Sequence, residues 1–274
     1  MIEQLRNKAA QWNVTIEETR DTASSLLGFG VRDGRRVVLK IAKSMSDEVR
    51  SGEVLRAFGS DGVVRVYEAE PGAVLLERLD PGEELVSLVR RGDDDEATRI
   101  LADVIARLKG HKAPVGTPTV ADYGRAFDWY VRTNDQQVPS QLVREARALY
   151  HNLAATQHTT MLLHGDLQHY NVLYDNERGW LAIDPKGVVG ELEYEVGALM
   201  RNPMEQPELY TLRATIERRL ELLTSLLPLN RWRVLRWCFA QAVLSAVWGV
   251  EDGYKIECDH AGLRLAFMLK QMLD

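Results

Sequence analysis

The chain has 274 residues, a formal net charge of −6, 45% hydrophobic and 27% charged residues, and two cysteines. This length and composition are typical of a globular protein with one large domain or two lobes. Two cysteines are too few for a disulfide framework, and no apolar run is long enough to span a membrane. The negative net charge argues against a nucleic-acid binder, which would need a basic surface. Residues 1–8 are polar and lack a signal-peptide pattern, so we expect a cytoplasmic location.

A β-hairpin is predicted near the start of the chain. An Asp-Gly turn at 32–35 joins a strand at 26–31 to a strand at 36–42. In the second strand, Lys40 shares a face with Val38. Because the strand is otherwise apolar at this end, the Lys40 ammonium needs a partner.

One helix and two further strands complete the predicted N-terminal lobe. Residues 44–58 have helical periodicity, with Ser44 or Ser46 as the N-cap. Strands are predicted at 63–70 and 73–79, on either side of a Pro-Gly turn.

From residue 80 onward, most of the predicted elements are helices. We therefore predict an α+β, bilobal fold: a small antiparallel sheet lobe with one helix at residues 1–79, and a larger, mostly helical lobe at 80–274. The predicted helices, which all have apolar residues at the helical period, span residues 85–90, 96–108, 120–132, 140–155, 207–227, 231–250 and 260–273.

The segment between Asn171 and Asp184 is predicted to be a second β-hairpin, within the helical lobe. If Asp175 faces Trp180 across the turn, the two ends of the segment lie opposite each other, about 5 Å apart at Cα. Amide and carboxylate oxygens that meet at one point suit Mg²⁺, which takes one or two protein oxygens together with waters and nucleotide oxygens. Asp166, in the loop that enters the hairpin, is then placed to accept a proton from a substrate hydroxyl.

The order of these residues is also informative. The stretch from His164 to Asn171 has the pattern His-x-Asp-Leu-x-x-x-Asn, and a turn that begins with Asp184 follows. This is the order of the catalytic loop and the metal loop in the kinase fold. The turn reads Asp-Pro-Lys-Gly where protein kinases have Asp-Phe-Gly, and no Ala-Pro-Glu follows. Without that peptide-docking segment, a small-molecule acceptor is favoured and no protein partner is implied.

Each of these residues also has a plainer interpretation. His164 is interpreted as a hydrogen-bonded framework residue of the loop rather than a proton shuttle. A transition-metal site at His164, Asp166 and His169 is an alternative, although no third soft ligand has suitable spacing. For Asp166, Asn171 and Asp184, the alternative is an ordinary polar hairpin. It is disfavoured because the residue types, their order and their spacing all agree with a phosphoryl-transfer site.

Lys40 is predicted to contact the α- and β-phosphates of ATP, and it needs a helix carboxylate to hold it. Glu48 lies about 20° from Leu55 around the predicted helix, whereas Glu53 lies about 160° away. An acid on the core-facing side of a helix is the one that needs a partner. We therefore predict that Glu48 pairs with Lys40 and that Glu53 faces solvent.

The other nucleotide contacts are predicted from loops. The Gly-Phe-Gly stretch at 28–30 lacks the third glycine of a phosphate-binding loop. The phosphate-covering loop is placed instead at Ser24 and Ser25, where hydroxyls and backbone N–H groups can meet phosphate oxygens. Adenine is expected to bind backbone groups around Glu77 and Leu79, at the connection between the lobes.

These motifs are similar to those of the aminoglycoside/hydroxyurea antibiotic-resistance kinases, the branch that contains streptomycin 6-phosphotransferases. The similarity is carried mainly by residues 164–171, 179–185 and 189–191, and weaker support extends over most of the chain. It implies a protein-kinase-like fold and ATP-dependent O-phosphorylation of an aminoglycoside or of hydroxyurea. The roles that it implies are the base for Asp166, magnesium ligands for Asn171 and Asp184, and a phosphate contact for Lys40.

A cationic acceptor needs carboxylates and benefits from an aromatic face. Glu191, which follows the metal loop closely, is the preferred carboxylate, and Trp248 and Asp252 are expected to form the opposite wall of the acceptor site. Lys186 is interpreted either as a phosphate contact or as a solvated charge. Glu195 is expected to anchor the catalytic loop by hydrogen bonds.

Two other functions stay open. A kinase of a metabolite such as a sugar, an amino alcohol or a hydroxyurea-like acceptor would use the same fold. A nucleotide-binding regulatory pseudokinase would lack at least one of four residues that this chain retains: Lys40, Asp166, Asn171 and Asp184.

Overall fold

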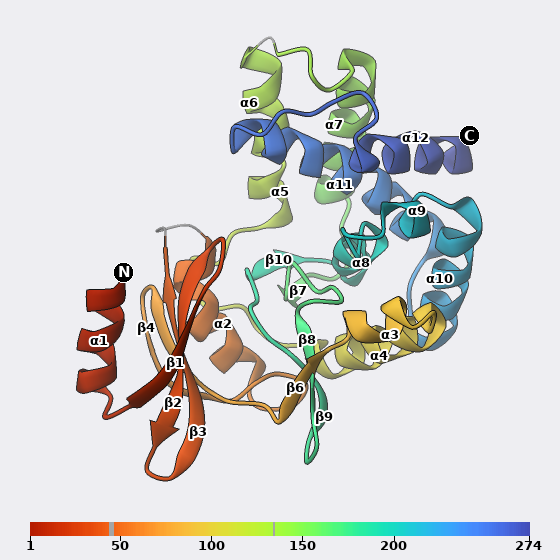
Figure 1. Cartoon of the computed structure of the whole chain (residues 1–274). Helices are drawn as coiled ribbons and strands as arrows, with labels where there is room; N and C mark the ends of the chain where they lie inside the picture. Colours follow the sequence, from red (N-terminus) through yellow and green to blue (C-terminus); the bar gives the residue numbers. More distant parts are fainter. Residues whose placement is uncertain (44–46, 134) are drawn as a thin grey trace.

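The computed structural model describes residues 1–43, 47–133 and 135–274, and these form a smaller and a larger lobe (Figure 1). The smaller lobe is built on an antiparallel sheet with the strand order β1-β2-β3-β5-β4. The strands are β1 (Thr15–Asp21), β2 (Ser25–Arg32), β3 (Arg35–Ala42), β4 (Val66–Glu70) and β5 (Ala73–Glu77). The hairpin predicted around the Asp-Gly turn is confirmed as β2 and β3.

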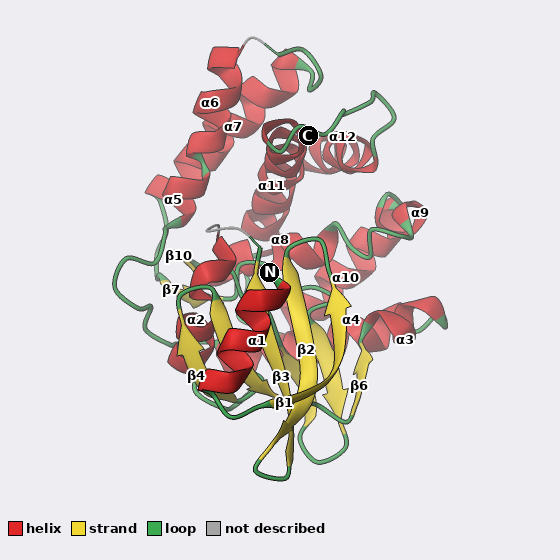
Figure 2. Ribbon diagram, turned by 60° about the vertical axis from the view of Figure 1, so that its left-hand side comes forward, coloured by secondary structure: helices red, strands yellow, loops and turns green. Residues whose placement is uncertain are grey.

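The two faces of this sheet have different environments. Helix α1 (Ile2–Gln11) lies across one face, as Figure 2 shows, and Val37 and Leu39 of β3 are buried in the core beneath it. Val38 and Lys40 alternate with those residues and line a cavity on the other face. The predicted placement of Val38 and Lys40 on one face is therefore confirmed, and this alternation brings the lysine into the cavity.

Helix α2 (Ser51–Phe58) follows a single 3-10 turn, η1 (Asp47–Arg50), and packs against β4 and β5. The predicted N-caps of this helix, Ser44 and Ser46, lie outside the described residues.

The prediction of one helix in this lobe is wrong, because α1 is a second helix, and β1 was also not predicted. Strand β1 is exposed along nearly its whole length, so its residues do not alternate between apolar and polar. Helix α1 buries only Leu5 and Ala9, which is too short an apolar stripe to identify it.

The larger lobe is mostly helical, as predicted, and its helices meet in one core around α11. They are α3 (Val86–Arg90), α4 (Asp94–Leu108), α5 (Val120–Tyr123), α6 (Arg125–Thr133), α7 (Ser140–Ala155), α8 (Leu192–Met200), α9 (Pro207–Tyr210), α10 (Arg213–Leu226), α11 (Arg231–Glu251) and α12 (Ala261–Leu273).

Two predicted helices are each divided in the structure, and one observed helix was not predicted. The predicted helix 120–132 is divided at Gly124, where an added Cβ would lie 2.7 Å from the Tyr150 ring. The predicted helix 207–227 is divided into α9 and α10 around Thr211. Helix α8 was missed because it is buried almost all round, so its sequence has no polar face to reveal the period.

Short strands connect the helices and carry the loops of the site. Strands β8 (Val172–Asp175) and β9 (Gly179–Ala182) form the predicted second hairpin, and β6 (Pro81–Glu84) pairs with β8. Strands β7 (Met161–Leu163) and β10 (Val188–Gly190) form a separate pair. The predicted boundary at 79/80 falls just before β6, where the chain leaves the first sheet, and it stays a prediction.

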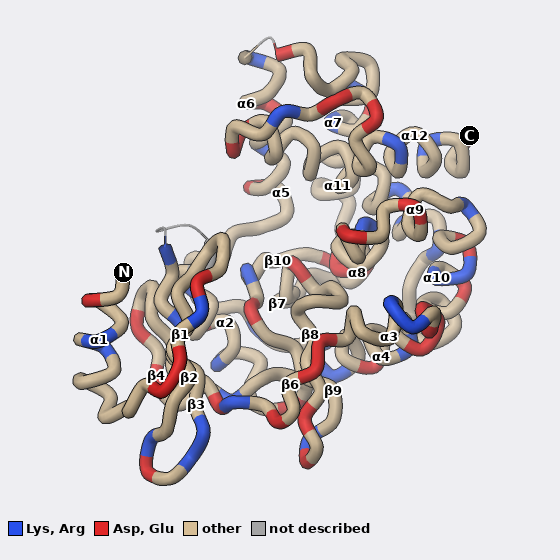
Figure 3. Tube along the Cα trace, in the orientation of Figure 1, with Lys and Arg blue, Asp and Glu red and all other residues tan. Residues whose placement is uncertain are grey.

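Charges of both signs are interspersed along both lobes (Figure 3). None of the helices in the described part of the chain combines the length and the apolarity that a bilayer span requires.

A buried ion pair joins α4 to α10 in the core of the larger lobe. The Arg219 side chain is fully buried, and its Nη2 and Nε atoms donate to Asp94 Oδ1 and Oδ2 at 2.5 and 3.1 Å. Its Nη1 atom also donates to the carbonyls of Leu199 and Asn202 at 3.0 and 2.8 Å. Burial would raise the pKa of Asp94, but its hydrogen bonds from Arg219 lower it. The pair is therefore charged and fully hydrogen-bonded, which is the arrangement that makes loss of one partner costly.

Replacing Arg219 with leucine is expected to lower the free energy of unfolding by about 3–5 kcal/mol, because the Asp94 carboxylate would stay buried without its cation. The neighbouring Arg218 is the matched control, since its side chain is 43% exposed, pairs closely with the exposed Asp95 and reaches Asp94 only at 3.4 Å. Arg218→Leu should cost less than about 1 kcal/mol. Urea denaturation of both variants measures the difference, and equal losses would contradict the role of the buried pair.

Candidate active site

The buried His164 side chain supports the catalytic loop by hydrogen bonds to the backbone. Its ring is completely buried, Nε2 lies 2.8 Å from the carbonyl oxygen of Ile183, and Nδ1 accepts the backbone N–H of Asp166 at 3.3 Å. Burial lowers the pKa of His164, so the ring is neutral and can accept that N–H. The interpretation of His164 as a framework residue is confirmed.

Glu195 of α8 anchors the same loop from the other side, as the sequence predicted. Its carboxylate accepts the backbone N–H groups of His164 at 2.7 Å and of Gly165 at 3.0 Å. Burial raises the pKa of Glu195 to about 7 and outweighs these N–H bonds, which lower it. Helix α8 thereby fixes the backbone just before Asp166.

This anchor has a measurable pH dependence. The pKa of Glu195 is higher in the folded chain (about 7) than its ordinary value of 4.5, so the folded state binds the proton more tightly and stability falls as pH rises between these values. Between pH 4.5 and about 7, the free energy of unfolding of the wild type should therefore fall by about 3 kcal/mol more than that of the Glu195→Gln variant, which cannot titrate at this position. Denaturation curves at several pH values test this, and parallel pH profiles for the two proteins would contradict it.

The hairpin that carries the metal loop has a register one residue different from the prediction. Asp175 faces Gly179, not Trp180, and Asn171 is opposite Ile183, whose N–H donates to the Asn171 carbonyl at 2.9 Å. The cause is the turn, in which three residues are followed by Gly179 in the left-handed conformation (φ 72°).

The two predicted metal ligands nevertheless line one cavity. In a regular strand, this register would point Asn171 and Asp184 to opposite faces. Asp184 leaves the strand in the left-handed conformation, with φ 59°, which aspartate adopts more readily than most residues. Its side chain and that of Asn171 both line the cavity next to the sheet. A non-glycine residue in this conformation is a feature often found at functional sites.

The oxygen atoms of these two residues suit magnesium. Asn171 donates its amide N–H to the carbonyl of Asp166 at 2.8 Å, so its amide oxygen is the atom that the predicted metal contact would use. Among the described residues there is no cluster of three or more His, Cys, Asp or Glu side chains that could hold a metal. This finding contradicts the transition-metal alternative at His164, Asp166 and His169, which would need such a cluster.

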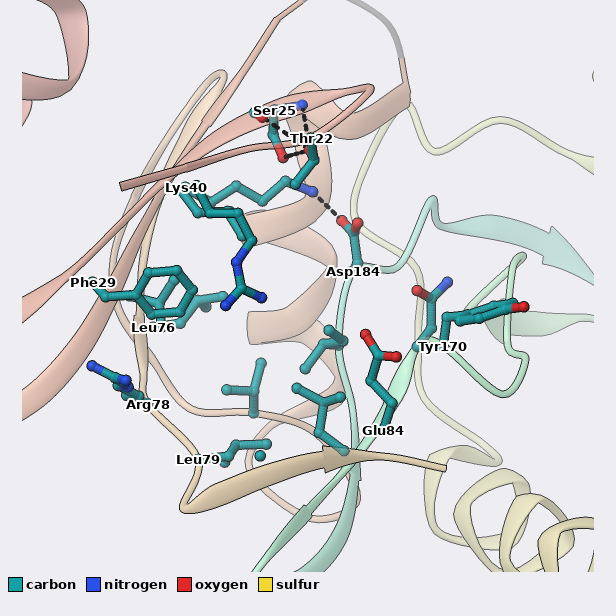
Figure 4. Close-up of a pocket in the computed structure, with 18 of the residues that line it drawn as sticks. Thr22, Ser25, Phe29, Lys40, Leu76, Arg78, Leu79, Glu84, Tyr170 and Asp184 are labelled. Atoms are coloured by element: carbon teal, nitrogen blue, oxygen red, sulfur yellow. Dashed lines mark hydrogen bonds and ion pairs between the residues drawn. The ribbon is translucent and has the colours of Figure 1, made fainter. Parts of the chain in front are cut away.

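The cavity next to the sheet has a volume of about 540 Å³ (Figure 4). Leu27, Val38 and Leu76 from the sheet and Leu173 and Ile183 from the hairpin give it apolar walls. A planar base needs such walls. Glu77 and Leu79, the residues predicted near adenine, also line this cavity.

Lys40 and Asp184 meet at the inner end of this cavity. The Lys40 ammonium donates to Asp184 Oδ1, and the side chains are 9% and 31% exposed (Figure 4). The prediction that Glu48 pairs with Lys40 falls on a side chain outside the described residues. Glu53 is exposed and pairs with Arg50 at 2.9 Å, as a solvent-facing residue is expected to do.

The turn between β1 and β2 closes over the same cavity. Ser24 and Ser25 line it, and Thr22 Oγ1 accepts the backbone N–H of Ser25 at 3.0 Å. The glycines at 28 and 30 have another role: a Cβ added to Gly30 would lie 2.0 Å from the Thr15 carbonyl oxygen, so this glycine lets β1 approach. The geometry favours the serine turn over the glycines as the phosphate-covering loop.

A second, larger cavity of about 1020 Å³ lies on the other side of the catalytic loop, in the helical lobe. Asp166, Trp248 and Asp252 line it; Trp248 belongs to the last turn of α11, and Asp252 directly follows the end of that helix. Tyr170 lines both cavities, so they meet at the catalytic loop. The base candidate lines this second cavity, which we call the acceptor cavity, and the metal-ligand candidates line the first, which we call the nucleotide cavity.

The prediction that Glu191 contacts the acceptor is wrong. Its side chain is 3% exposed, lies 2.5 Å from both Arg233 Nε and Trp237 Nε1, and is not part of the acceptor cavity. Arg233 also donates to the carbonyls of Leu153 and Thr156, both at 3.0 Å. Glu191 thus joins the start of α8 to α11, while Arg233 joins α11 to the end of α7.

Several residues of both cavities were not predicted. In the acceptor cavity, Glu251 adds a second carboxylate next to Asp252, and burial together with that neighbour raises the pKa of Glu251. In the nucleotide cavity, Arg20 and Arg78 lie over the Phe29 ring at 5.2 and 5.0 Å. Arg20 belongs to β1, so it could not be placed without predicting that strand.

The comparisons with known proteins agree with this geometry. The family model of the aminoglycoside/hydroxyurea antibiotic resistance kinases matches residues 11–253. The chain is 34% identical over 269 residues to a streptomycin 3''-kinase of Klebsiella pneumoniae, covering 96% of this chain and 99% of that protein. It is 32% identical over 230 residues to a streptomycin 6-kinase of Streptomyces griseus, covering 81% of this chain and 73% of that protein.

The fold also has close structural relatives. An apo crystal structure of a thermostable mutant of the aminoglycoside phosphotransferase APH(4)-Ia matches with a TM-score of 0.69 at 17% identity, covering 98% of this chain and 99% of that one. This likeness confirms the predicted bilobal, protein-kinase-like α+β fold.

Proposed function

The chain belongs to the aminoglycoside/hydroxyurea antibiotic resistance kinase family, and we propose from this that it transfers the γ-phosphoryl group of ATP to a hydroxyl of an aminoglycoside, with streptomycin as the first candidate. In this proposal, residues 1–79 form the nucleotide lobe and residues 80–274 form the catalytic and acceptor lobe.

One observation supports the proposal most directly. Asp166 lines the acceptor cavity, Asn171 and Asp184 line the nucleotide cavity, and Tyr170 lines both. A phosphoryl donor and a hydroxyl acceptor that occupy these cavities would meet at the catalytic loop, with the base on the acceptor side. This is the arrangement that transfer between two bound substrates needs.

The proposed mechanism follows from these positions. Lys40 binds the α- and β-phosphates, the Ser24–Ser25 turn covers the phosphates, and backbone groups near Glu77 and Leu79 bind adenine. Asn171 and Asp184 would hold Mg²⁺, which supplies charge neutralisation at the phosphates when it is bound. Asp166 orients the acceptor hydroxyl and takes its proton as the oxygen attacks the γ-phosphorus, while the bond to the ADP oxygen breaks in line.

The acceptor cavity supports a cationic acceptor. The Trp248 ring offers a face for an ammonium or guanidinium group, and the Asp252 and Glu251 carboxylates lie at the end of α11. The two streptomycin kinases that resemble this chain are named for different hydroxyls of the drug, so the family does not select the hydroxyl.

The second candidate acceptor is hydroxyurea, which the description of the family names beside aminoglycosides. Lys40, Asp166, Asn171 and Asp184 are all brought to the two cavities, which favours an enzyme over a regulatory pseudokinase.

The test is phosphate transfer by the purified protein with MgATP and a panel of streptomycin, hydroxyurea, a sugar and an amino alcohol. Phosphorylated streptomycin, detected by mass spectrometry, and growth of a sensitive bacterium that expresses the chain on streptomycin are the expected results. Phosphorylation of only the sugar or the amino alcohol would replace the proposal with a metabolite kinase. ATP binding without any transfer would favour the pseudokinase.

A further inference from the structure

Lys186 lies in an unusual place for a lysine of the metal loop. It follows Asp184 by two residues, but it lines the acceptor cavity together with Asp166. Its ammonium lies 5.7 Å from the centre of the Trp248 ring. The sequence left open whether this lysine contacts a phosphate or is solvated; the structure instead places its charge on an aromatic ring of the acceptor site.

The Lys186 ammonium has no close acidic partner among the described residues. Within the ranges that the structure describes, no carboxylate lies within ion-pair distance of the Lys186 ammonium, although the side chain is partly buried. A cation over an indole ring gains only about 0.5–2 kcal/mol. An anion delivered to this cavity would therefore attract the ammonium away from the ring.

The base of the Lys186 side chain lies next to the catalytic loop. A Cβ added to Gly165, the residue before Asp166, would lie 3.6 Å from the Cβ of Lys186. From this fixed base, a lysine has a flexible four-carbon stem and three N–H donors that can be redirected. Rotation of the stem can therefore carry the charge between the Trp248 ring and the region where Asp166 meets the transferred group.

The Trp248 ring is also the surface that a cationic acceptor would use. Tyr123 packs against it at an interplanar angle of 89°, with the centres 5.7 Å apart, so part of the ring is already covered. An acceptor ammonium or guanidinium and the Lys186 ammonium would repel each other on the remaining surface.

We propose that Lys186 is a further catalytic residue, whose ammonium is displaced from the Trp248 ring by the acceptor cation and then contacts the phosphoryl group during transfer. This inference rests on the proposed function. Lys186 stays an ammonium throughout and forms no covalent bond. The acceptor oxygen bonds to the γ-phosphorus, the bond to the ADP oxygen breaks with its electron pair, and Asp166 takes the hydroxyl proton.

The first test is the effect of Lys186→Met on turnover with streptomycin and MgATP. Loss of a charge that acts on the transferred group should lower kcat by about 10²-fold, with little change in the KM for ATP. Lys186→Arg should recover at least a tenth of the wild-type kcat, because it keeps the charge. Lys112→Met is the matched control, since this lysine is exposed on the loop between α4 and α5, and it should change kcat less than twofold. Unchanged turnover in Lys186→Met, or an arginine variant as slow as the methionine variant, would overturn the proposal.

The second test measures binding alone, by calorimetric titration of streptomycin without nucleotide. Lys186→Met should bind the acceptor about threefold more tightly than wild type, because the competing cation is gone from the ring. The gain should disappear when both chains carry Trp248→Leu. Equal gains with and without the ring, or weaker binding by Lys186→Met, would contradict displacement.

The outcomes also separate this inference from the function on which it rests. A wild-type protein that neither binds nor phosphorylates streptomycin overturns the proposed function, and the inference with it. An active wild type with a fully active Lys186→Met variant overturns only the role of Lys186.

Discussion

Replacing Asp166 with asparagine should lower kcat by about 10³-fold while the dissociation constant for ATP changes less than about twofold. The amide keeps the shape of the side chain but cannot accept a proton from the acceptor hydroxyl. ATP binding should be spared because Asp166 lines the acceptor cavity, whereas Lys40 and Asp184 line the nucleotide cavity. Single-turnover transfer and equilibrium nucleotide binding measure the two effects.

The same variant shows how Asp166 acts. If Asp166 only positioned the hydroxyl, asparagine would retain much of that function, and turnover would fall less than about tenfold. A near-normal kcat would therefore remove Asp166 from the role of base. A large loss of ATP affinity would show instead that the substitution disturbs Asn171, which donates to the Asp166 carbonyl at 2.8 Å and lies 3.4 Å from its Oδ2.

Replacing Asp184 with asparagine should also lower kcat by about 10³-fold, and it should remove most of the dependence of ATP binding on Mg²⁺. A neutral amide is a weaker ligand for a hard cation than a carboxylate, and the substitution also removes the Asp184 charge that pairs with the Lys40 ammonium. Nucleotide titrations with and without Mg²⁺, together with steady-state turnover, measure these effects.

Asp33 provides a matched control for this substitution. Both aspartates have left-handed backbones, with φ 50° at Asp33 and 59° at Asp184, and asparagine tolerates that conformation as well as aspartate. Asp33 lies on the exposed turn between β2 and β3, with 86% of its side chain accessible. Asp33→Asn should leave turnover and magnesium dependence unchanged. Equal losses in the two variants would mean that the backbone conformation, and not the carboxylate, is what matters.

The sequence was most informative where the residues that act together lie close along the chain. Asp166, Asn171 and Asp184 fall within one loop and one hairpin, so the motif identified them and the structure brings them to adjoining cavities. The register was predicted one residue wrong because it depends on the backbone conformation of Gly179. The left-handed turn at Asp184, which the sequence did not reveal, offsets that shift.

The acidic residues after the hairpin show where this approach fails. Glu191 and Glu195 are four residues apart and both are buried. Glu195 accepts N–H groups of the catalytic loop, whereas Glu191 pairs with Arg233, which is 42 residues away in sequence. Sequence spacing gives no measure of such distant partners. The same limit applies to Arg20, whose strand has no clear pattern, and to Lys186, whose position over Trp248 depends on the packing of α11.

Tyr170 lines both cavities, so the space for the nucleotide and the space for the acceptor adjoin at this side chain. Two ligands that occupy adjoining cavities can be joined by a short tether. A bisubstrate compound that links an adenosine group to an aminoglycoside past Tyr170 would bind its second half at a high effective concentration, and its affinity would exceed that of either half.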